Sequence, residues 1–301
     1  MKFALASLAL ACTLGSAAHA QTAASPAAAG TLAKIQSSGK VVLGVLESSP
    51  PMSFALGSER RYVGYHVELC EKLVAQIVPK AKVEYMAMTP QNSLPLVQNA
   101  TVDLGCGPKT NNLARQKEVA FAYTTYVSQV RMAVRADSGI TSFKQLDGKN
   151  IAASAGTTAV QLLRKFARDN NVALPTSLGK DQFESFLMLE SGRAEAFAID
   201  DNLLAGLIAS SKNPTGYKIV GEVLGAEPIA ILMRREDPEF KKAVDAALGE
   251  MMKSGEVAKV YDKWFMQPIP PSGKSLNLPM SDALKQLLKE PNDKPVEAYA
   301  N

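Results

Sequence analysis

Short apolar runs rich in β-branched residues alternate with amphipathic segments along most of this chain, and this alternation constrains its fold most. It predicts an α/β fold in which helices cover parallel sheets, with ligands bound beyond the carboxyl ends of the strands. We expect strands at 41–46, 83–88, 102–106, 129–134, 151–155, 194–199 and 230–233. We expect helices at 66–78, 158–171, 181–190, 202–210 and 238–265.

The first twenty residues have the pattern of a secretory signal peptide. Lys2 is followed by an apolar stretch at 3–14 and then by small residues ending at Ala20, after which we expect cleavage. The apolar stretch is too short to span a bilayer, and no later segment approaches twenty apolar residues, so we expect a soluble mature protein. Lipid attachment at Cys12 is a less favoured alternative. Residues 21–30 are Ala-rich and predict a flexible leader.

The length and charge of the chain indicate two lobes and no nucleic-acid partner. The remaining residues, about 280, exceed one average domain. The 33 basic and 29 acidic residues are spread along the chain without a basic block. Two weak breaks in the pattern predict an outer lobe made of 31–127 and 228–301 and an inserted lobe at 128–227, with a cleft between them.

The segment TNNLARQKEVAF, residues 110–121, places a hydroxyl and a guanidinium five residues apart at a predicted junction of strand and helix. Arg115 offers two parallel N–H donors, and Thr110 and the free amides of the helix start add further donors. This geometry suits a ligand carboxylate. The alternative is an ordinary capped helix with a surface Arg, and the segment by itself favours that simpler interpretation.

Two later junctions supply complementary groups. Thr157 and Thr158 open the helix predicted after the strand at 151–155, so their hydroxyls and first-turn amides could hold the same anion from the other lobe. Asp200 and Asp201 end the strand at 194–199. We expect one carboxylate to cap the following helix and Asp200 to face a ligand ammonium. Plain capping is the alternative at both places.

A catalytic, metal or cofactor role finds little support in the sequence. The mature chain keeps one histidine, His66, which we interpret as a polar residue at a helix entrance. One His without a Cys pair at ligand spacing does not predict a zinc site, and no phosphate loop, Gly-rich dinucleotide turn or G-x-S-x-G elbow is present in context. We expect no cofactor. Cys70 and Cys106 enter an oxidising compartment, where their pairing stays open.

Seven segments together resemble the family 3 solute-binding proteins. They are TLAKIQSSGKVVLGVLESSPPMSF, GYHVEL, DLGCGPKTNNLARQKEVAF, SAGTTAV, LESGRAEAFAIDDNLLAG, RREDPEFKK and SGEVAKVYDKWF. The resemblance runs from Thr31 to Asn292 and is strongest to the glutamate/aspartate-binding proteins of ABC importers. It implies a two-lobed periplasmic binding protein fold of type II, a monomer in the periplasm that closes over one amino acid. It also implies delivery to an ABC permease in the inner membrane, without enzymatic activity.

By position, the resemblance also assigns roles in the cleft. Arg115, Thr110 and Thr158 match residues that bind the ligand α-carboxylate, and Asp200 matches the acid that binds the α-ammonium. Pro108 stands where the family motif G-S-T-T-N-N has Ser, which removes a hydroxyl and leaves a backbone carbonyl as an acceptor. These assignments imply a free α-amino acid as the ligand.

The side-chain part of the pocket departs from the glutamate/aspartate pattern. Leu46 and Ser93 stand where the motifs G-H-R-E-S-S and S-Q-N-R have Arg, and Gln182 stands where K-D-H-G-D-S-F has His. A side-chain carboxylate left unpaired would cost on the order of 3 to 5 kcal/mol. We therefore expect a neutral or modestly polar amino acid. The pocket residues that we predict for its side chain are Leu46, Ser49, Pro90, Ser93, Gln182 and, as a cation that could turn into the cleft, Lys109.

An enzyme on the same scaffold is the second hypothesis. Periplasmic dehydratases that resemble this family, such as cyclohexadienyl dehydratase, use a cleft acid and a cation to expel water or carboxylate from a ring. Glu184, Asp200 and Lys109 are the candidate groups for such chemistry in this chain.

Overall fold

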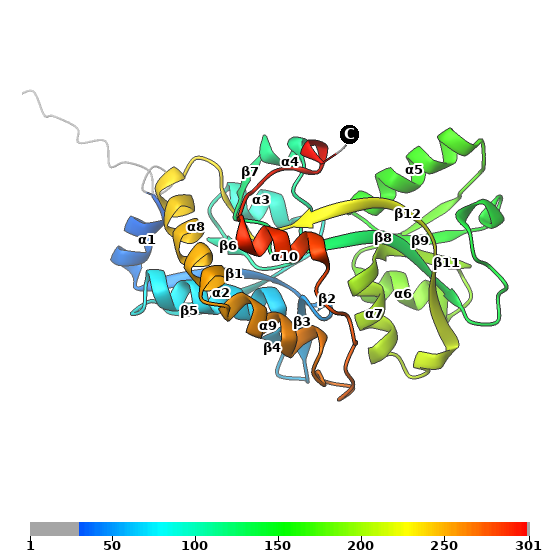
Figure 1. Cartoon of the computed structure of the whole chain (residues 1–301), viewed down its shortest axis with the longest axis horizontal. Helices are drawn as coiled ribbons and strands as arrows, with labels where there is room; N and C mark the ends of the chain where they lie inside the picture. Colours follow the sequence, from blue (N-terminus) through cyan, green and yellow to red (C-terminus); the bar gives the residue numbers. More distant parts are fainter. Residues whose placement is uncertain (1–29, 300–301) are drawn as a thin grey trace, which may run out of the picture.

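The computed structural model describes residues 30–299, which form two lobes joined by two long strands (Figure 1). Each lobe is built on a five-stranded sheet covered by helices, so the α/β prediction is confirmed. The predicted signal peptide, residues 1–20, lies outside the described residues, and so does the predicted leader except for Gly30. In the described part of the chain, no helix has both the length and the apolar character needed to cross a membrane.

Lobe 1 is the lobe whose sheet has the order β5-β1-β6-β13-β7. Both β5 and β6 pair in parallel with β1, whereas β13 is antiparallel to β6 and β7. Its strands are β1 (Lys40–Leu46), β5 (Lys82–Met88), β6 (Leu104–Gly105), β7 (Val119–Phe121) and β13 (Leu232–Arg234). A small antiparallel sheet is added by β2 (Ser48–Ser49), β3 (Ser53–Leu56) and β4 (Arg61–Val63).

The helices of lobe 1 come from both ends of the described chain. They are α1 (Thr31–Ser38), α2 (Tyr65–Ile77), α3 (Ser93–Gln98), α4 (Leu113–Gln116), α8 (Pro238–Lys253), α9 (Glu256–Phe265) and α10 (Asp282–Lys289). Along β1, Leu43 and Val45 belong to a core cluster that includes residues of α2, α8 and α9, while Leu46 belongs to a second cluster with Val97 of α3. Because side chains alternate along a strand, β1 has a buried apolar surface on both faces.

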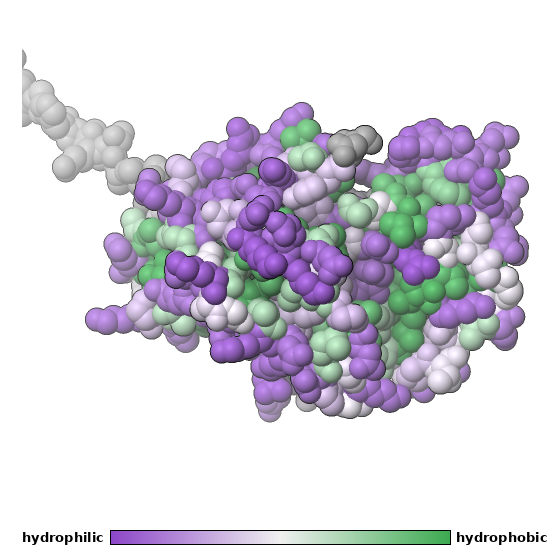
Figure 2. Space-filling view, viewed as in Figure 1, coloured by the Kyte–Doolittle hydropathy of each residue, from purple (hydrophilic) through white to green (hydrophobic). Residues whose placement is uncertain are grey.

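Lobe 2 has the sheet order β10-β9-β11-β8-β12. Its strands are β8 (Tyr126–Arg135), β9 (Ile151–Ser154), β10 (Thr176–Gly179), β11 (Ala196–Asp200) and β12 (Tyr217–Ile229), and its helices are α5 (Thr158–Asn170), α6 (Gln182–Glu190) and α7 (Asp201–Ser210). The prediction of parallel strands is right for β9, β10 and β11 but wrong for β8, which is antiparallel to β11. Strand β12, which was not predicted, is also antiparallel to β8. Figure 2 shows hydrophobic side chains at the surface of this lobe, on the right of the view, more than on lobe 1.

Two antiparallel strands, β8 and β12, connect the lobes, and we call them the crossover strands (Figure 1). Tyr126 is paired with Ile229 at the lobe 1 end, and an irregularity in the register lies between Val220 and Gly225. The lobe boundaries predicted from sequence, at 127/128 and 227/228, both fall within this paired region and stay a prediction.

One long predicted helix is broken in the structure. The segment 238–265 forms α8 and α9, separated at Ser254 and Gly255. Gly255 has φ of 79°, a left-handed conformation that glycine adopts without steric cost. The apolar periodicity continues through both helices, which explains why sequence reasoning merged them.

The lobes touch each other through the backbone at two glycines. At Gly156 of lobe 2 an added Cβ would lie 2.6 Å from the Cα of Gln91, and at Gly206 it would lie 2.2 Å from the carbonyl oxygen of Pro50. Both partners belong to lobe 1. The absence of a Cβ therefore allows two main-chain segments to approach each other at each point.

Candidate ligand-binding site

A cavity with residues from both lobes lies beside the crossover strands. Its lining residues are Pro90, Pro108, Lys109, Thr110, Arg115, Gly156, Thr157, Thr158, Gln182, Ile199, Asp200, Leu203 and Ile229. Its free space is about 20 Å³, because side chains from the two lobes reach across and bond to one another. A ligand the size of an amino acid would require the lobes to separate and these bonds to be exchanged for bonds to the ligand.

Arg115 joins the two lobes at the cavity. Its Nη1 donates to the carbonyl of Thr110, 2.9 Å away in lobe 1, and its Nη2 donates to the carbonyl of Gly156, 3.2 Å away in lobe 2. Burial lowers the pKa of the guanidinium, while Glu227 and Asp200 act in the opposite direction. The side chain therefore remains a cation fixed at the mouth between the lobes.

The predicted helix after Thr110 is only a single turn. The side chain of Asn112 accepts the amide of Arg115, and Glu297 accepts the amide of Leu113 at 3.0 Å. Two of the amides that we expected to be free for an anion, those of Leu113 and Arg115, therefore already have acceptors in the protein. Thr110 instead forms an isolated β-bridge with Ile229, which ties the segment that bears it to the crossover strands.

The start of α5 remains open to an anion. Thr157 is its N-cap residue but makes no side-chain capping bond, because its hydroxyl donates to the carbonyl of Ser154 at 2.7 Å. The amides of the first turn thus lack a side-chain acceptor from the cap. They lie on the cavity side together with Arg115, and an anion placed there would be favoured by the helix dipole.

The two acids at the end of β11 have different environments. Asp201 accepts the amides of Asn202 and Gln129, whereas Asp200 lines the cavity, makes no capping bond and accepts from Ser128. Burial, with a smaller contribution from the charge of Glu227, raises the pKa of Asp200 to about 7. A cation beside Asp200 would restore its ionised form.

Glu227 on β12 contacts residues of the site from both lobes, and sequence reasoning missed it. Its Oε2 accepts from the hydroxyls of Thr110 at 2.7 Å and Thr158 at 2.9 Å, one from each lobe. Burial raises its pKa, although both hydroxyls and Arg115 oppose the shift. In this conformation the two hydroxyls that we predicted for a ligand carboxylate are therefore donating to a carboxylate of the protein. No local motif identifies Glu227, because it comes close to Thr110 and Thr158 only in the folded chain.

The side-chain end of the cavity contains three of the six residues predicted for it: Pro90, Lys109 and Gln182. The ammonium of Lys109 donates to the carbonyl of Pro90 at 2.7 Å, and Lys109 is only 5% exposed. Burial, together with Arg115, lowers the pKa of Lys109 well below its ordinary value, against the influence of Asp200. Gln182 accepts at Oε1 from Ser48 of lobe 1 at 2.9 Å.

The other three predicted residues do not line the cavity. Leu46 is buried in the lobe 1 core, where its side chain packs against Gly107. Ser93 donates to the carbonyl of Pro90 at 3.2 Å, and Ser49 is fully buried. In this conformation they are therefore not part of the cavity lining, and their role in the pocket stays a prediction. Sequence reasoning found the segments but did not show which face of each segment points into the cavity.

Of the three candidate groups for enzyme chemistry, Asp200 and Lys109 line the cavity and Glu184 does not. Glu184 is absent from the cavity lining, and its carboxylate accepts the amide of Lys180 at 2.8 Å at the start of α6. Among residues 30–299, no group of three or more His, Cys, Asp or Glu side chains is arranged to hold a metal ion.

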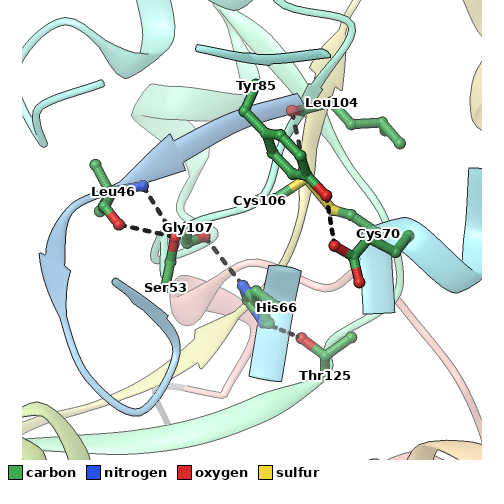
Figure 3. Close-up of a disulfide and its surroundings, with 10 residues drawn as sticks. Leu46, Ser53, His66, Cys70, Tyr85, Leu104, Cys106, Gly107 and Thr125 are labelled. Carbon is green, nitrogen blue, oxygen red and sulfur yellow. Dashed lines mark hydrogen bonds between the residues drawn. A yellow bond between two sulfur atoms is a disulfide. The ribbon is translucent and has the colours of Figure 1, made fainter. Parts of the chain in front are cut away.

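Cys70 and Cys106 form a disulfide, a question that the sequence left open. The bond joins α2 to the residue that follows β6, only two residues before Pro108 of the cavity (Figure 3). A covalent link thus fixes one end of the segment that leads into the cavity.

The sequence matches the model of the bacterial extracellular solute-binding proteins, family 3, over residues 41–267. The chain belongs to this family. An L-glutamate/L-aspartate-binding protein from Pseudomonas aeruginosa is 43% identical over 274 residues, covering 89% of this chain and 90% of the relative. A glutamate/aspartate import solute-binding protein from Escherichia coli is 40% identical over 276 residues, covering 90% and 91%.

The fold comparison agrees with the family. A mutant of ArgBP from T. maritima superimposes with a TM-score of 0.71 at 26% identity, covering 78% of this chain and 99% of that structure. This family 3 solute-binding protein therefore has the two-lobed fold with a cleft between the lobes that the sequence predicted.

Proposed function

We propose that this solute-binding protein closes its lobes over a free α-amino acid in the periplasm and delivers it, as a monomer and without chemical change, to the permease of an ABC importer in the inner membrane. The observation that carries the proposal is the placement of opposite charges in one cavity. Arg115 and the open start of α5 lie on the cavity with Asp200. An α-amino acid has a carboxylate and an ammonium on one carbon, which is the ligand that this arrangement fits.

In this proposal the α-carboxylate binds Arg115 and the backbone amides at the start of α5, at Thr157 and Thr158. The α-ammonium binds Asp200 and the carbonyl of Pro108, which also lines the cavity. Because the hydroxyls of Thr110 and Thr158 donate to Glu227, their oxygens have lone pairs left for a ligand N–H. Alternatively, the ligand carboxylate displaces Glu227 from these hydroxyls.

The charges around the cavity favour a neutral or modestly polar side chain. Asp200 and Glu227 already supply two buried carboxylates against the guanidinium of Arg115. Lys109 is a poor further source of positive charge, since burial lowers its pKa and its ammonium already bonds to Pro90. A ligand side-chain carboxylate would therefore add charge without a strong partner, at a cost on the order of 3 kcal/mol or more.

A glutamate or aspartate ligand is the second candidate, favoured by the names of the relatives and by the position of Lys109 in the cavity lining. Titration calorimetry with the twenty amino acids separates the two candidates. We expect a neutral amino acid to bind at least tenfold more tightly than glutamate or aspartate. Tight binding of glutamate with weak binding of every neutral amino acid would contradict the proposed side chain, and binding of no amino acid would contradict the proposed function.

A further inference from the structure

His66 is a fully buried histidine that lies outside the cavity lining and links three parts of lobe 1 (Figure 3). It is located in the first turn of α2, one helical turn before Cys70 of the disulfide. Its Nδ1 lies 3.0 Å from the carbonyl oxygen of Gly107, and its Nε2 lies 2.7 Å from Oγ1 of Thr125. Both ring nitrogens are thus engaged in the protein interior.

The two partners of His66 lie next to the cavity-lining residues 108–110 and to the crossover strands. Gly107 directly precedes the segment of Pro108, Lys109 and Thr110, all of which line the cavity. Thr125 directly precedes β8, and its amide donates to the carbonyl of Ile229 at the end of β12, 3.0 Å away. The imidazole therefore bridges the cavity segment and the lobe 1 ends of both crossover strands.

The hydrogen atoms in this network can be assigned. The carbonyl of Gly107 can only accept, so Nδ1 must carry the hydrogen. In a neutral ring Nε2 then accepts. The hydroxyl of Thr125 lies 2.7 Å from Nε2 and 3.1 Å from the carbonyl oxygen of Ile229, and its single hydrogen goes to the nearer acceptor, Nε2. The carbonyl of Ile229 remains satisfied by the amide of Thr125. Burial lowers the pKa of His66 to about 4, which agrees with a neutral ring at pH 7.

We propose that His66 is a positioning residue for ligand binding: its Nδ1–H orients the peptide that joins Gly107 to Pro108, and the bond between its Nε2 and Thr125 keeps the ring beside the crossover strands. The proposal rests on the proposed function, because its effect would be on amino-acid affinity. The disulfide already connects α2 to Cys106, so His66 is not needed to attach this segment. What the ring adds is the direction of the carbonyls that follow, including that of Pro108.

A matched pair of variants separates the two ring contacts. The amide of Asn can stand in for Nδ1, and the longer Gln can place its amide near the position of Nε2. His66→Asn should keep the bond to Gly107 and lose the one to Thr125, whereas His66→Gln should do the reverse. Calorimetry with L-glutamine and L-glutamate as probes should show a loss of about tenfold or more for His66→Gln and less than about threefold for His66→Asn.

Tyr65→Phe is the control for simple destabilisation. It removes a buried hydrogen bond from the Tyr65 hydroxyl to the carbonyl of Thr125, 2.9 Å away. We expect it to lower the melting temperature by about as much as the His66 variants but to leave both affinities within twofold. If all three variants lose affinity only in proportion to their lost stability, His66 has a structural role and the positioning role is refuted.

Nitrogen NMR of the imidazole gives a readout that needs no ligand. The chain has two histidines, and His19 falls in the predicted signal peptide, so the secreted protein should give the signals of His66. We expect a protonated Nδ1 and an unprotonated Nε2. The opposite tautomer cannot donate to Gly107 and would overturn the positioning role even if amino acids bind. Wild-type protein that shows the expected tautomer but binds no amino acid would instead overturn the proposed function.

Discussion

The two ends of the cavity are built in different ways. The end proposed for the α-carbon combines groups from both lobes: Arg115 from lobe 1, and Thr158 and Asp200 from lobe 2. Thr158 begins α5 and Asp200 is the N-cap residue of α7, whereas Arg115 is the third residue of the single-turn helix α4. The side-chain end is made mainly by Pro90 and Lys109 of lobe 1, with Gln182 from α6.

This difference separates what the fold determines from what individual side chains determine. At the α-carbon end, chain direction and helix starts place the charged groups, so the same arrangement can hold the common part of any amino acid. At the side-chain end, the direction in which each side chain points and its length decide which atoms contact the ligand. We therefore expect substitutions at the first end to change affinity for all amino acids and those at the second end to change preference.

Arg115→Ala should have the largest effect. The substitution removes the guanidinium that joins Thr110 to Gly156, so we expect every amino acid to lose roughly a thousandfold in affinity, or about 4 kcal/mol. Arg131→Ala is the matched control, because the guanidinium of Arg131 donates to the carbonyl of Gly221 and does not line the cavity. An Arg115→Ala variant that binds within threefold of the wild type would refute the assignment of this end.

Asp200→Asn should cost about a hundredfold in affinity and remove most of the pH dependence of binding. Since the pKa of Asp200 is raised to about 7, its carboxyl takes up a proton as the pH falls below 7 and must lose it to bind an ammonium. Wild-type affinity should therefore fall by about tenfold per pH unit below 7. Calorimetry at pH 5.5, 6.5 and 7.5 measures this, and parallel pH profiles for wild type and variant would count against the assigned role.

Lys109→Met tests the side-chain end. Loss of the bond from the ammonium to the carbonyl of Pro90 should weaken neutral amino acids by about fivefold, or roughly 1 kcal/mol, without changing the order of preference. Competition binding with glutamine and glutamate measures that order. A wild type that prefers glutamate and a variant that loses this preference would show that Lys109 pairs with an acidic side chain.

Gln182→Ala should have the smallest effect, about threefold, because it removes one neutral bond between the lobes. Ser48 supplies the other side of that bond, so Ser48→Ala and the double variant complete a double-mutant cycle. Because the hydroxyl of Ser48 also accepts the amide of Gln182 at 3.3 Å, we expect Ser48→Ala to cost slightly more than Gln182→Ala and the double variant to bind about as well as Ser48→Ala. Fully additive losses would mean that the contact between Ser48 and Gln182 does not contribute to closure.

The sequence predicted the elements that have strong periodicity and failed where tertiary contacts decide. Strand β1 and helix α5 were predicted close to their observed bounds, because their apolar patterns are continuous. Strand β12 was missed, since Gly221 and Gly225 interrupt it and much of it is only partly buried. Its antiparallel pairing with β8 was missed for the same reason.

At the site, local junctions were predictable and long-range partners were not. Arg115 and Asp200 lie at recognisable junctions, and both line the cavity. Glu227 contacts Thr110, 117 residues earlier in the chain, so no local pattern could assign it. Leu46 was assigned to the pocket by the position of an Arg in related motifs, but its side chain packs in the core of lobe 1.

The close approach of Gly156 to Gln91 and of Gly206 to Pro50 limits how far the two lobes can close. Because main chain meets main chain at both points, the lobes cannot come closer, whatever ligand lies between them. In this conformation the cavity between the lobes has only about 20 Å³ of free space, so a bound amino acid would hold the lobes short of this limit. The approach of Gly156 to Gln91 and of Gly206 to Pro50 therefore marks full closure, and a ligand that holds the lobes apart would open a gap at both places.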